Sequence, residues 1–176
     1  MLLAFVVASI VAWIALEGAA SPAEPHARLP RELATGMTLL AVHVTAIGEH
    51  LARDATSAGV LGMLGVLAIA GGIALRISAI RTLGARFVST TLAPDRRVTS
   101  GPYRWLRHPS EVGLLAAAAG TAAALGSIGA AAITIAVLVP LSLVRCADED
   151  SALGVSARDE RSTSDCSPAS RSSPRA

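Results

Sequence analysis

One stretch of the chain constrains its fold more than any other, because 33 consecutive residues, from Val112 to Val144, carry no charged side chain. A single helix of that length would extend about 50 Å, since each residue adds about 1.5 Å. The apolar core of a bilayer is only about 30 Å thick. The tetrapeptide Gly-Ser-Ile-Gly at 126–129 interrupts the stretch near its middle. The sequence therefore predicts a helical hairpin, with arms at 112–125 and 130–145 and a kink at Pro140 in the second arm.

Three more apolar runs precede the hairpin and predict three more membrane helices, at 1–16, 33–48 and 57–75. Of all residues, 52% are hydrophobic and 16% are charged, whereas charged residues make up about 25% of ordinary soluble domains. We therefore expect an all-α, integral membrane helical bundle of about five transmembrane helices, the last two forming the hairpin. The first run could instead be a signal peptide, but no basic residue precedes it, which favours a retained span.

Two features inside the expected spans have both a functional and a structural interpretation. Gly59, Gly62 and Gly65 form a strip on which another helix could pack closely, or they are simply tolerated in lipid. His43 is an ionisable residue within a membrane helix, which marks it as a functional candidate. A lone histidine beside Thr45 is more often a neutral hydrogen-bonding partner between helices. We therefore expect a structural role for His43.

Arginines concentrate in the segment 81–110, which holds six of them against a single acidic residue. Membrane proteins keep such positively charged loops on the cytoplasmic side. Counting helices outward from this segment places the loop 17–32 and the segment 145–160 in the cytoplasm as well, and the loop 49–56 on the opposite side. The two polar segments that could build a site, 81–110 and 145–160, should therefore share the cytoplasmic face.

The remaining composition narrows the function classes and the location. A net charge of +2 is too balanced for a surface that binds nucleic acid. Cys146 and Cys166 have no spacing typical of a metal site or a disulfide framework, so we expect no metal. All basic residues apart from histidine are arginine, which suggests a GC-rich genome and a bacterial inner (plasma) membrane. Residues 154–176 are rich in Ser, Arg and Pro and predict a disordered tail after a membrane domain at 1–153.

A motif with clear local chemistry precedes the hairpin, and it reads Gly101-Pro102-Tyr103-Arg104-Trp105-Leu106-Arg107-His108-Pro109-Ser110-Glu111-Val112-Gly113. Pro109 ends any helix before it and suits the first turn of a helix after it. Arg107 and His108 should then project at the cytoplasmic mouth of that next helix. Free backbone N–H groups and an adjacent arginine attract anions there. The same arginines could instead serve only as topology signals at lipid headgroups.

This motif resembles the signature of the integral-membrane methyltransferases typified by isoprenylcysteine carboxyl methyltransferase, to which the phospholipid methyltransferases are related. The family signature is Gly-x-Tyr-Arg-x-x-Arg-His-Pro-x-Tyr-x-Gly, and the matching residues are Gly101, Tyr103, Arg104, Arg107, His108, Pro109 and Gly113. Downstream, Arg145, Glu149, Asp150 and Leu153 are similar to the family element Arg-x-x-x-Glu-Glu-x-x-Leu. The resemblance covers the motif region 70–153.

The resemblance implies a five-helix membrane enzyme with a pocket for S-adenosylmethionine at the cytoplasmic face. The residues that would bind this cofactor are Tyr103, Arg107, His108, Pro109, Glu149 and Asp150. Arg107 could hold the carboxylate of the cofactor, while the two acids could accept hydrogen bonds from ribose hydroxyls or the ammonium group. Glu149 and Asp150 could instead be part of a solvated acidic patch, because Asp148 precedes them.

The expected activity is methylation of a lipophilic small molecule or lipid, with a carboxyl, phenol or lipid amine as the acceptor group and O-methylation favoured. A carboxylate is already ionised, whereas a phenol or an amine benefits from a base, and His108 and Glu111 are the candidates for that catalytic role. Glu111 stands where the family signature has tyrosine. It could tune the choice of substrate, or it could simply favour the start of the helix through its negative charge.

Two other interpretations compete with the methyltransferase. Membrane reductases of the steroid-reductase-like type carry a similar Arg-His-Pro element and use NADPH. The acidic pair at 149 and 150 favours the methyltransferase over them. A non-catalytic remnant of the methyltransferase scaffold is the third interpretation, because the residues after Gly154 lack the tyrosines that the family normally has there.

Overall fold

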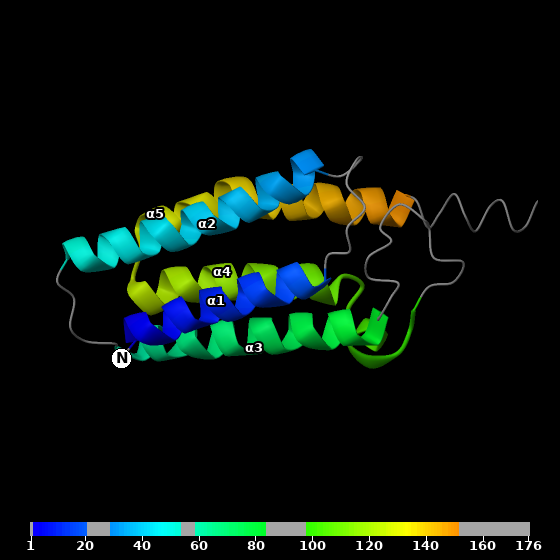
Figure 1. Cartoon of the computed structure of the whole chain (residues 1–176), viewed down its shortest axis with the longest axis horizontal. Helices are drawn as coiled ribbons and strands as arrows, with labels where there is room; N and C mark the ends of the chain where they lie inside the picture. The colour runs from blue at the N-terminus through cyan, green and yellow to red at the C-terminus, as the bar shows by residue number, and fades with distance from the viewer. Residues whose placement is uncertain (1, 21–28, 54–58, 84–97, 152–176) are drawn as a thin grey trace, which may run out of the picture.

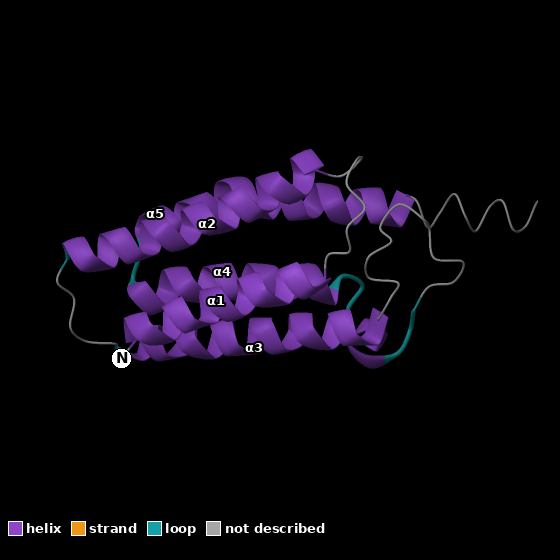
Figure 2. Ribbon diagram, in the orientation of Figure 1, coloured by secondary structure: helices purple, strands orange, loops and turns teal. Residues whose placement is uncertain are grey.

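The computed structural model describes residues 2–20, 29–53, 59–83 and 98–151, and every regular element in these ranges is helical (Figures 1 and 2). The elements are α1 (Leu2–Ala20), α2 (Leu29–Ala52), α3 (Val60–Leu83), η2 (Gly101–Arg104), α4 (Pro109–Leu125), α5 (Ile128–Ile133) and the π-helical turn η3 (Thr134–Leu138). The helix that begins with α5 continues to Ser151. The loop expected at 17–32 was wrong at both ends, because α1 continues to Ala20 and α2 begins at Leu29. The rest of that loop, 21–28, lies outside the described residues, as do the segment 84–97 and the expected disordered tail 154–176.

The all-α prediction is confirmed over the described residues. Two helices, Val60–Leu83 and Ile128–Ser151, are long and apolar enough to cross a membrane. Two shorter apolar helices, Leu3–Ala15 and Pro109–Leu125, accompany them. These lengths support a membrane protein, while the number of five spans stays a prediction.

The predicted helical hairpin is formed by α4 and the helix that begins with α5. Gly126 ends α4 in the left-handed conformation, with φ of 64°, which glycine adopts without steric cost. The Ser127 hydroxyl then caps α5 by accepting a hydrogen bond from the Ala130 N–H at 3.0 Å. Glu49, near the end of α2, accepts a hydrogen bond from the Gly129 N–H at 3.0 Å. The turn of the hairpin is thus fixed to the end of α2, on the side away from the motif (Figure 1).

The kink expected at Pro140 stays a prediction, but a π-helical turn, η3, ends at Leu138, two residues before this proline. Proline has no N–H to donate to the preceding turn of the helix. In η3 the Val139 N–H donates to the Thr134 carbonyl, five residues earlier, rather than four. A widened turn of this kind is a known way for a helix to absorb a local break in its hydrogen bonding.

Glycines bring α3 and α4 into contact along an antiparallel interface (Figure 1). A Cβ atom added to Gly72 would lie 2.6 Å from the Gly113 carbonyl oxygen, and one added to Gly120 would lie 2.7 Å from the Gly65 carbonyl oxygen. The backbones therefore touch directly, as they do in membrane helices that pack through small residues. The strip expected at 59, 62 and 65 was wrong at Gly59, which has no heavy atom within 4 Å of an added Cβ.

His43 connects α2 to α4 inside the bundle. Its Nδ1 lies 2.7 Å from the Leu39 carbonyl oxygen, to which it can donate, and its Nε2 lies 3.4 Å from the Thr121 hydroxyl. The Thr121 hydroxyl donates to the Ala117 carbonyl at 2.9 Å. The Thr121 hydroxyl has one proton, which it can give to the Ala117 carbonyl or to Nε2, so this buried histidine has a polar group beside each ring nitrogen. The arrangement supports the structural role expected for His43.

We expect Thr121→Val to lower the stability of the bundle by about 0.6 kcal/mol, the average measured for hydrogen bonds between membrane helices, and by no more than about 1.7 kcal/mol, the largest value measured. The change keeps the shape of the side chain but removes the group that faces His43. The melting temperature of the protein in detergent measures the loss. Thr38→Val is the matched control, because the Thr38 hydroxyl donates to the Ala34 carbonyl of its own helix. Equal melting temperatures in the two variants would contradict the prediction.

Candidate functional site

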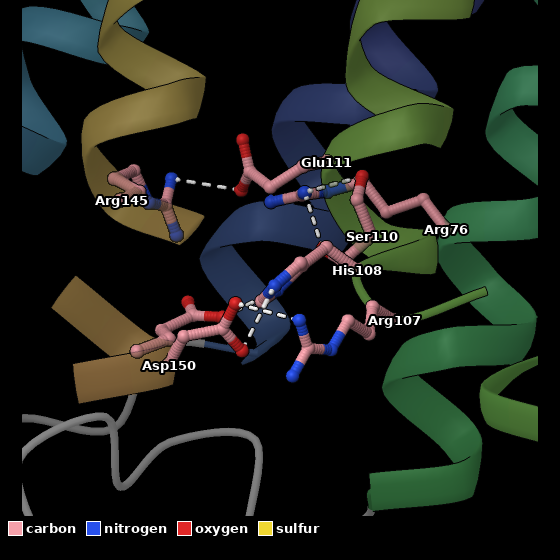
Figure 3. A network of polar contacts seen from close by, with 8 residues as sticks. Arg76, Arg107, His108, Ser110, Glu111, Arg145 and Asp150 are labelled. Carbon is pink, nitrogen blue, oxygen red and sulfur yellow. Dashed lines mark hydrogen bonds and ion pairs between the residues drawn. The ribbon is translucent and has the colours of Figure 1, made fainter. Parts of the chain in front are cut away.

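The two polar segments expected on one face meet at one end of the bundle, where α3 ends, α4 begins and the last helix ends (Figures 1 and 3). His108 Nδ1 lies 3.1 Å from Glu149 Oε2, and His108 Nε2 lies 3.5 Å from Asp150 Oδ1. Arg107 Nη1 lies 3.4 Å from Asp150 Oδ2. Residues separated by about 40 positions in the sequence thus form one cluster of opposite charges, which we call the His108 cluster (Arg107, His108, Glu149 and Asp150).

A proline and a glycine set the local backbone of the motif. Pro109 is buried at the first position of α4, and His108 occupies the cap position with φ of −126° and ψ of 65°. Its carbonyl accepts a hydrogen bond from the Val112 N–H at 3.1 Å. Gly101 begins η2 with φ of 57°, and an added Cβ there would lie 2.6 Å from the Thr82 hydroxyl. The start of the motif therefore packs against the end of α3, and its last residues lead directly into α4.

Tyr103 is half-buried in η2, close to the acidic side chains of the site. Burial raises the pKa of its phenol to about 12, and the negative charge of Glu149 adds to this shift while Arg76 opposes it. The phenol therefore keeps its proton at physiological pH. Tyr103 can donate a hydrogen bond in the site, but it cannot act there as a base.

Glu111 forms a second polar contact beside the His108 cluster. Its Oε1 lies 3.3 Å from Arg145 Nη1, so α4 and the last helix are joined by an ion pair (Figure 3). Glu111 is only 4% exposed, and its other carboxylate oxygen, Oε2, is buried without a hydrogen-bond partner among the described residues. Glu111 lies in the first turn of α4, where negative charge is favourable. The carboxylate thus has one paired oxygen and one oxygen that can accept a further donor.

Arg76 is a site residue that the sequence reasoning did not assign. It is 4% exposed on α3, and its Nη1 donates to the Ser110 hydroxyl at 2.7 Å. Its guanidinium carbon lies 4.8 Å from the centre of the Trp13 ring, in cation–π geometry. The available signal was an arginine that follows 21 uncharged residues (55–75), because a charge inside an apolar helix is costly in a membrane and therefore functional or structural by default. Arg76 links α1 and α3 to the start of α4.

Other motif residues lie outside these contacts. Trp105 is 80% exposed, with the Arg104 guanidinium 5.3 Å from the centre of its ring. No group of three or more potential metal ligands occurs among the residues that the structure describes.

A groove of about 150 Å³ lies beside Arg145 and is lined by Thr35 of α2 and by Pro140, Leu141, Val144 and Arg145 of the last helix. Arg145 therefore takes part in both the groove and the Glu111 ion pair.

Comparisons with known proteins place this region in a known group. A family model described as phospholipid methyltransferase matches residues 60–153, which is just over half of the chain. The matched range begins with α3 and includes the motif, α4 and the last helix, and so contains every residue of the His108 cluster. No curated protein and no solved structure matches the chain.

Proposed function

Because the chain belongs to the phospholipid methyltransferase family, within the group of integral-membrane methyltransferases that includes isoprenylcysteine carboxyl methyltransferase, we propose that it methylates a lipophilic acceptor with S-adenosylmethionine as the donor. The observation that carries the proposal is the His108 cluster, in which the motif and the acidic pair meet. The two elements that resemble the family signature are the same two that the fold brings together. We further propose residues 1–153 as the catalytic membrane domain.

The charged groups of the His108 cluster complement those of S-adenosylmethionine. The amino-acid end of this cofactor carries a carboxylate and an ammonium group, and the cluster offers a guanidinium beside two carboxylates. His108 Nε2 is buried and lies 3.5 Å from Asp150 Oδ1 but makes no hydrogen bond within the described residues, so a ligand group could take up its hydrogen-bonding capacity. Arg107, which is 62% exposed, would bind the cofactor carboxylate, and Glu149 and Asp150 would accept from the ammonium or ribose groups. Tyr103 would donate from its protonated phenol, and Pro109 would fix the backbone that presents His108.

The reaction follows from these placements. S-adenosylmethionine supplies an electrophilic methyl group on a sulfonium, and the protein has to align an acceptor with that group in a site from which water is excluded. Glu111 and His108 are the groups that could take a proton from a phenol or an amine acceptor. A carboxyl acceptor would need no base. The acceptor enters from the bilayer in this proposal, and the site faces the cytoplasm of a bacterial inner membrane, as the arginine-rich segment 81–110 favours.

We expect the purified protein in detergent to bind S-adenosylmethionine, and Arg107→Ala to weaken this binding by about 10- to 100-fold through the loss of a charge-assisted hydrogen bond. Isothermal titration calorimetry measures the dissociation constant directly. Arg81→Ala is the matched control, because Arg81 is an exposed arginine at the same end of α3. Equal loss in both variants would indicate a general charge effect and contradict the assignment of Arg107.

The same preparation separates a methyltransferase from a reductase. A ligand that binds the folded state raises the melting temperature, by an amount set by its concentration relative to its dissociation constant. We expect S-adenosylmethionine to raise it and NADPH to leave it unchanged. Stabilisation by NADPH alone would contradict the proposed function.

A further inference from the structure

We infer that Glu111 selects the methyl acceptor, because its free carboxylate oxygen requires a partner that carries a proton. The acceptor is then a lipid with an N–H or O–H at the reacting atom, and a lipid carboxylate is rejected. This inference rests on the proposed methyltransferase function and specifies its substrate class. It concerns a residue at which the chain departs from the family signature, which has tyrosine in place of Glu111.

The burial and pairing of Glu111 define the partner that it can take. The side chain is 6% exposed, and Arg145 satisfies only Oε1. Oε2 is buried and has no hydrogen-bond partner in the described part of the chain. Buried polar atoms in proteins are normally hydrogen-bonded, and those without partners frequently have functional roles. A carboxylate can only accept hydrogen bonds, so the missing partner is a donor.

The charges near Glu111 also disfavour an anionic acceptor. Glu149 and Asp150 lie in the adjacent His108 cluster, and both Glu111 and Glu149 act electrostatically on the Tyr103 phenol, which burial already keeps protonated. The two cations nearby are already engaged, since Arg145 is paired with Glu111 and the buried Arg76 donates to Ser110. A carboxylate placed at Oε2 would therefore meet a like charge at short range, whereas an amine or a hydroxyl would find its acceptor.

The groove beside Arg145 indicates where the apolar part of the acceptor lies. It is lined mainly by the apolar side chains of Pro140, Leu141 and Val144, and Arg145 connects it to Glu111. Its volume of about 150 Å³ is below the roughly 300 Å³ at which pockets for whole small molecules begin. The groove therefore takes a segment of the lipid chain next to the head group, and the remainder of the chain stays in the bilayer between α2 and the last helix.

The lone pair of the acceptor nitrogen or oxygen attacks the methyl carbon of the sulfonium donor and forms the new C–N or C–O bond. The C–S bond breaks, and its electron pair stays on sulfur, so the donor leaves as a neutral thioether. The proton of the acceptor N–H or O–H passes to Glu111 Oε2 and is then released to solvent.

The test uses the full chain in detergent micelles with methyl-labelled S-adenosylmethionine and three acceptors of equal chain length, a fatty amine, a long-chain phenol and a fatty acid. We expect labelling of the amine or the phenol, and which of the two is labelled identifies the reacting atom. Glu111→Gln keeps the hydrogen bond to Arg145 but cannot take a proton, so it should lower kcat by about 100-fold or more. Its affinity for S-adenosylmethionine should stay within a factor of about two, as calorimetry would show.

Two further measurements test the catalytic role of Glu111 and the role of the groove. With the phenol, the activity of Glu111→Gln should rise steeply as the pH approaches 10 and the acceptor ionises by itself, whereas the wild-type protein should gain little. Val144→Trp should raise the KM for the long-chain acceptors about tenfold by blocking the groove, with kcat unchanged. Asp148→Asn, which neutralises an exposed acid on the last helix, is the control for both.

Three results would contradict the inference that Glu111 selects the acceptor. Labelling of the fatty acid, full activity of Glu111→Gln, or labelling of none of the three acceptors by protein that binds S-adenosylmethionine would overturn it and leave the proposed function standing. Loss of S-adenosylmethionine binding in the unmodified chain would instead remove the proposed function itself.

Discussion

Replacing Gly72 with valine is expected to prevent α3 and α4 from packing and to remove most of the folded protein. A Cβ at this position would lie 2.6 Å from the Gly113 carbonyl oxygen and 2.8 Å from the Ala117 backbone nitrogen. Both neighbours are backbone atoms, so no side chain can rotate away. Overpacking typically costs about 1 to 3 kcal/mol even where side chains can adjust. We expect a larger cost here, against a total stability of about 5 to 15 kcal/mol for a typical protein.

The adjacent residue provides the control for this experiment. Gly71→Val makes the same change on the same helix, but nothing lies within 4 Å of the added Cβ. We expect the Gly71 variant to elute as a single species from gel filtration in detergent and to melt within a few degrees of the wild type. The Gly72 variant should aggregate or melt at a much lower temperature. Equal behaviour of the two variants would show that the close contact between α3 and α4 does not hold the bundle together.

The sequence predicted the helices well where local patterns decide the structure. The uncharged stretch from Val112 and the tetrapeptide at 126–129 together indicated a hairpin, and the structure ends α4 at Leu125 and begins α5 at Ile128. The predicted helix ends were wrong where a charged residue was taken to end a helix. The expected span at 57–75 continues as α3 to Leu83, because Arg76 is buried against its partners instead of ending the helix.

The sequence predicted only part of the candidate site. The placement of segments 81–110 and 145–160 on one face followed from the distribution of arginine, and the distances from His108 to Glu149 and Asp150 agree with it. The pairs Arg76–Ser110 and Arg145–Glu111 join residues 34 positions apart in each case. No local pattern in a single sequence specifies such partners, since they depend on how the helices rotate against one another. The close approach of Gly72 to Gly113 sets that rotation for α3 and α4.

The double change Glu149→Gln and Asp150→Asn is expected to weaken S-adenosylmethionine binding by about 1,000-fold and to abolish methyl transfer. It replaces both acidic acceptors of the His108 cluster with amides of nearly the same shape. Each charge-assisted hydrogen bond contributes about 1.5 to 3 kcal/mol, so the loss of two accounts for a change of this size. The remaining cluster would carry the Arg107 charge without a counterion, which also disfavours the ammonium group of the cofactor.

The fold should survive this double change, which makes the loss of binding interpretable. Glu149 and Asp150 are 36% and 34% exposed, and ion pairs at such positions typically contribute about 1 kcal/mol or less to stability. The melting temperature without cofactor should therefore stay close to that of the wild type, and Asp148→Asn, which neutralises the neighbouring acid, should leave both binding and activity intact. Cofactor affinity that is unchanged in the double variant would mean that the acidic pair only holds Arg107 and His108 in place. If Asp148→Asn lost affinity to the same extent, the general negative charge of this helix end, rather than the His108 cluster, would be responsible.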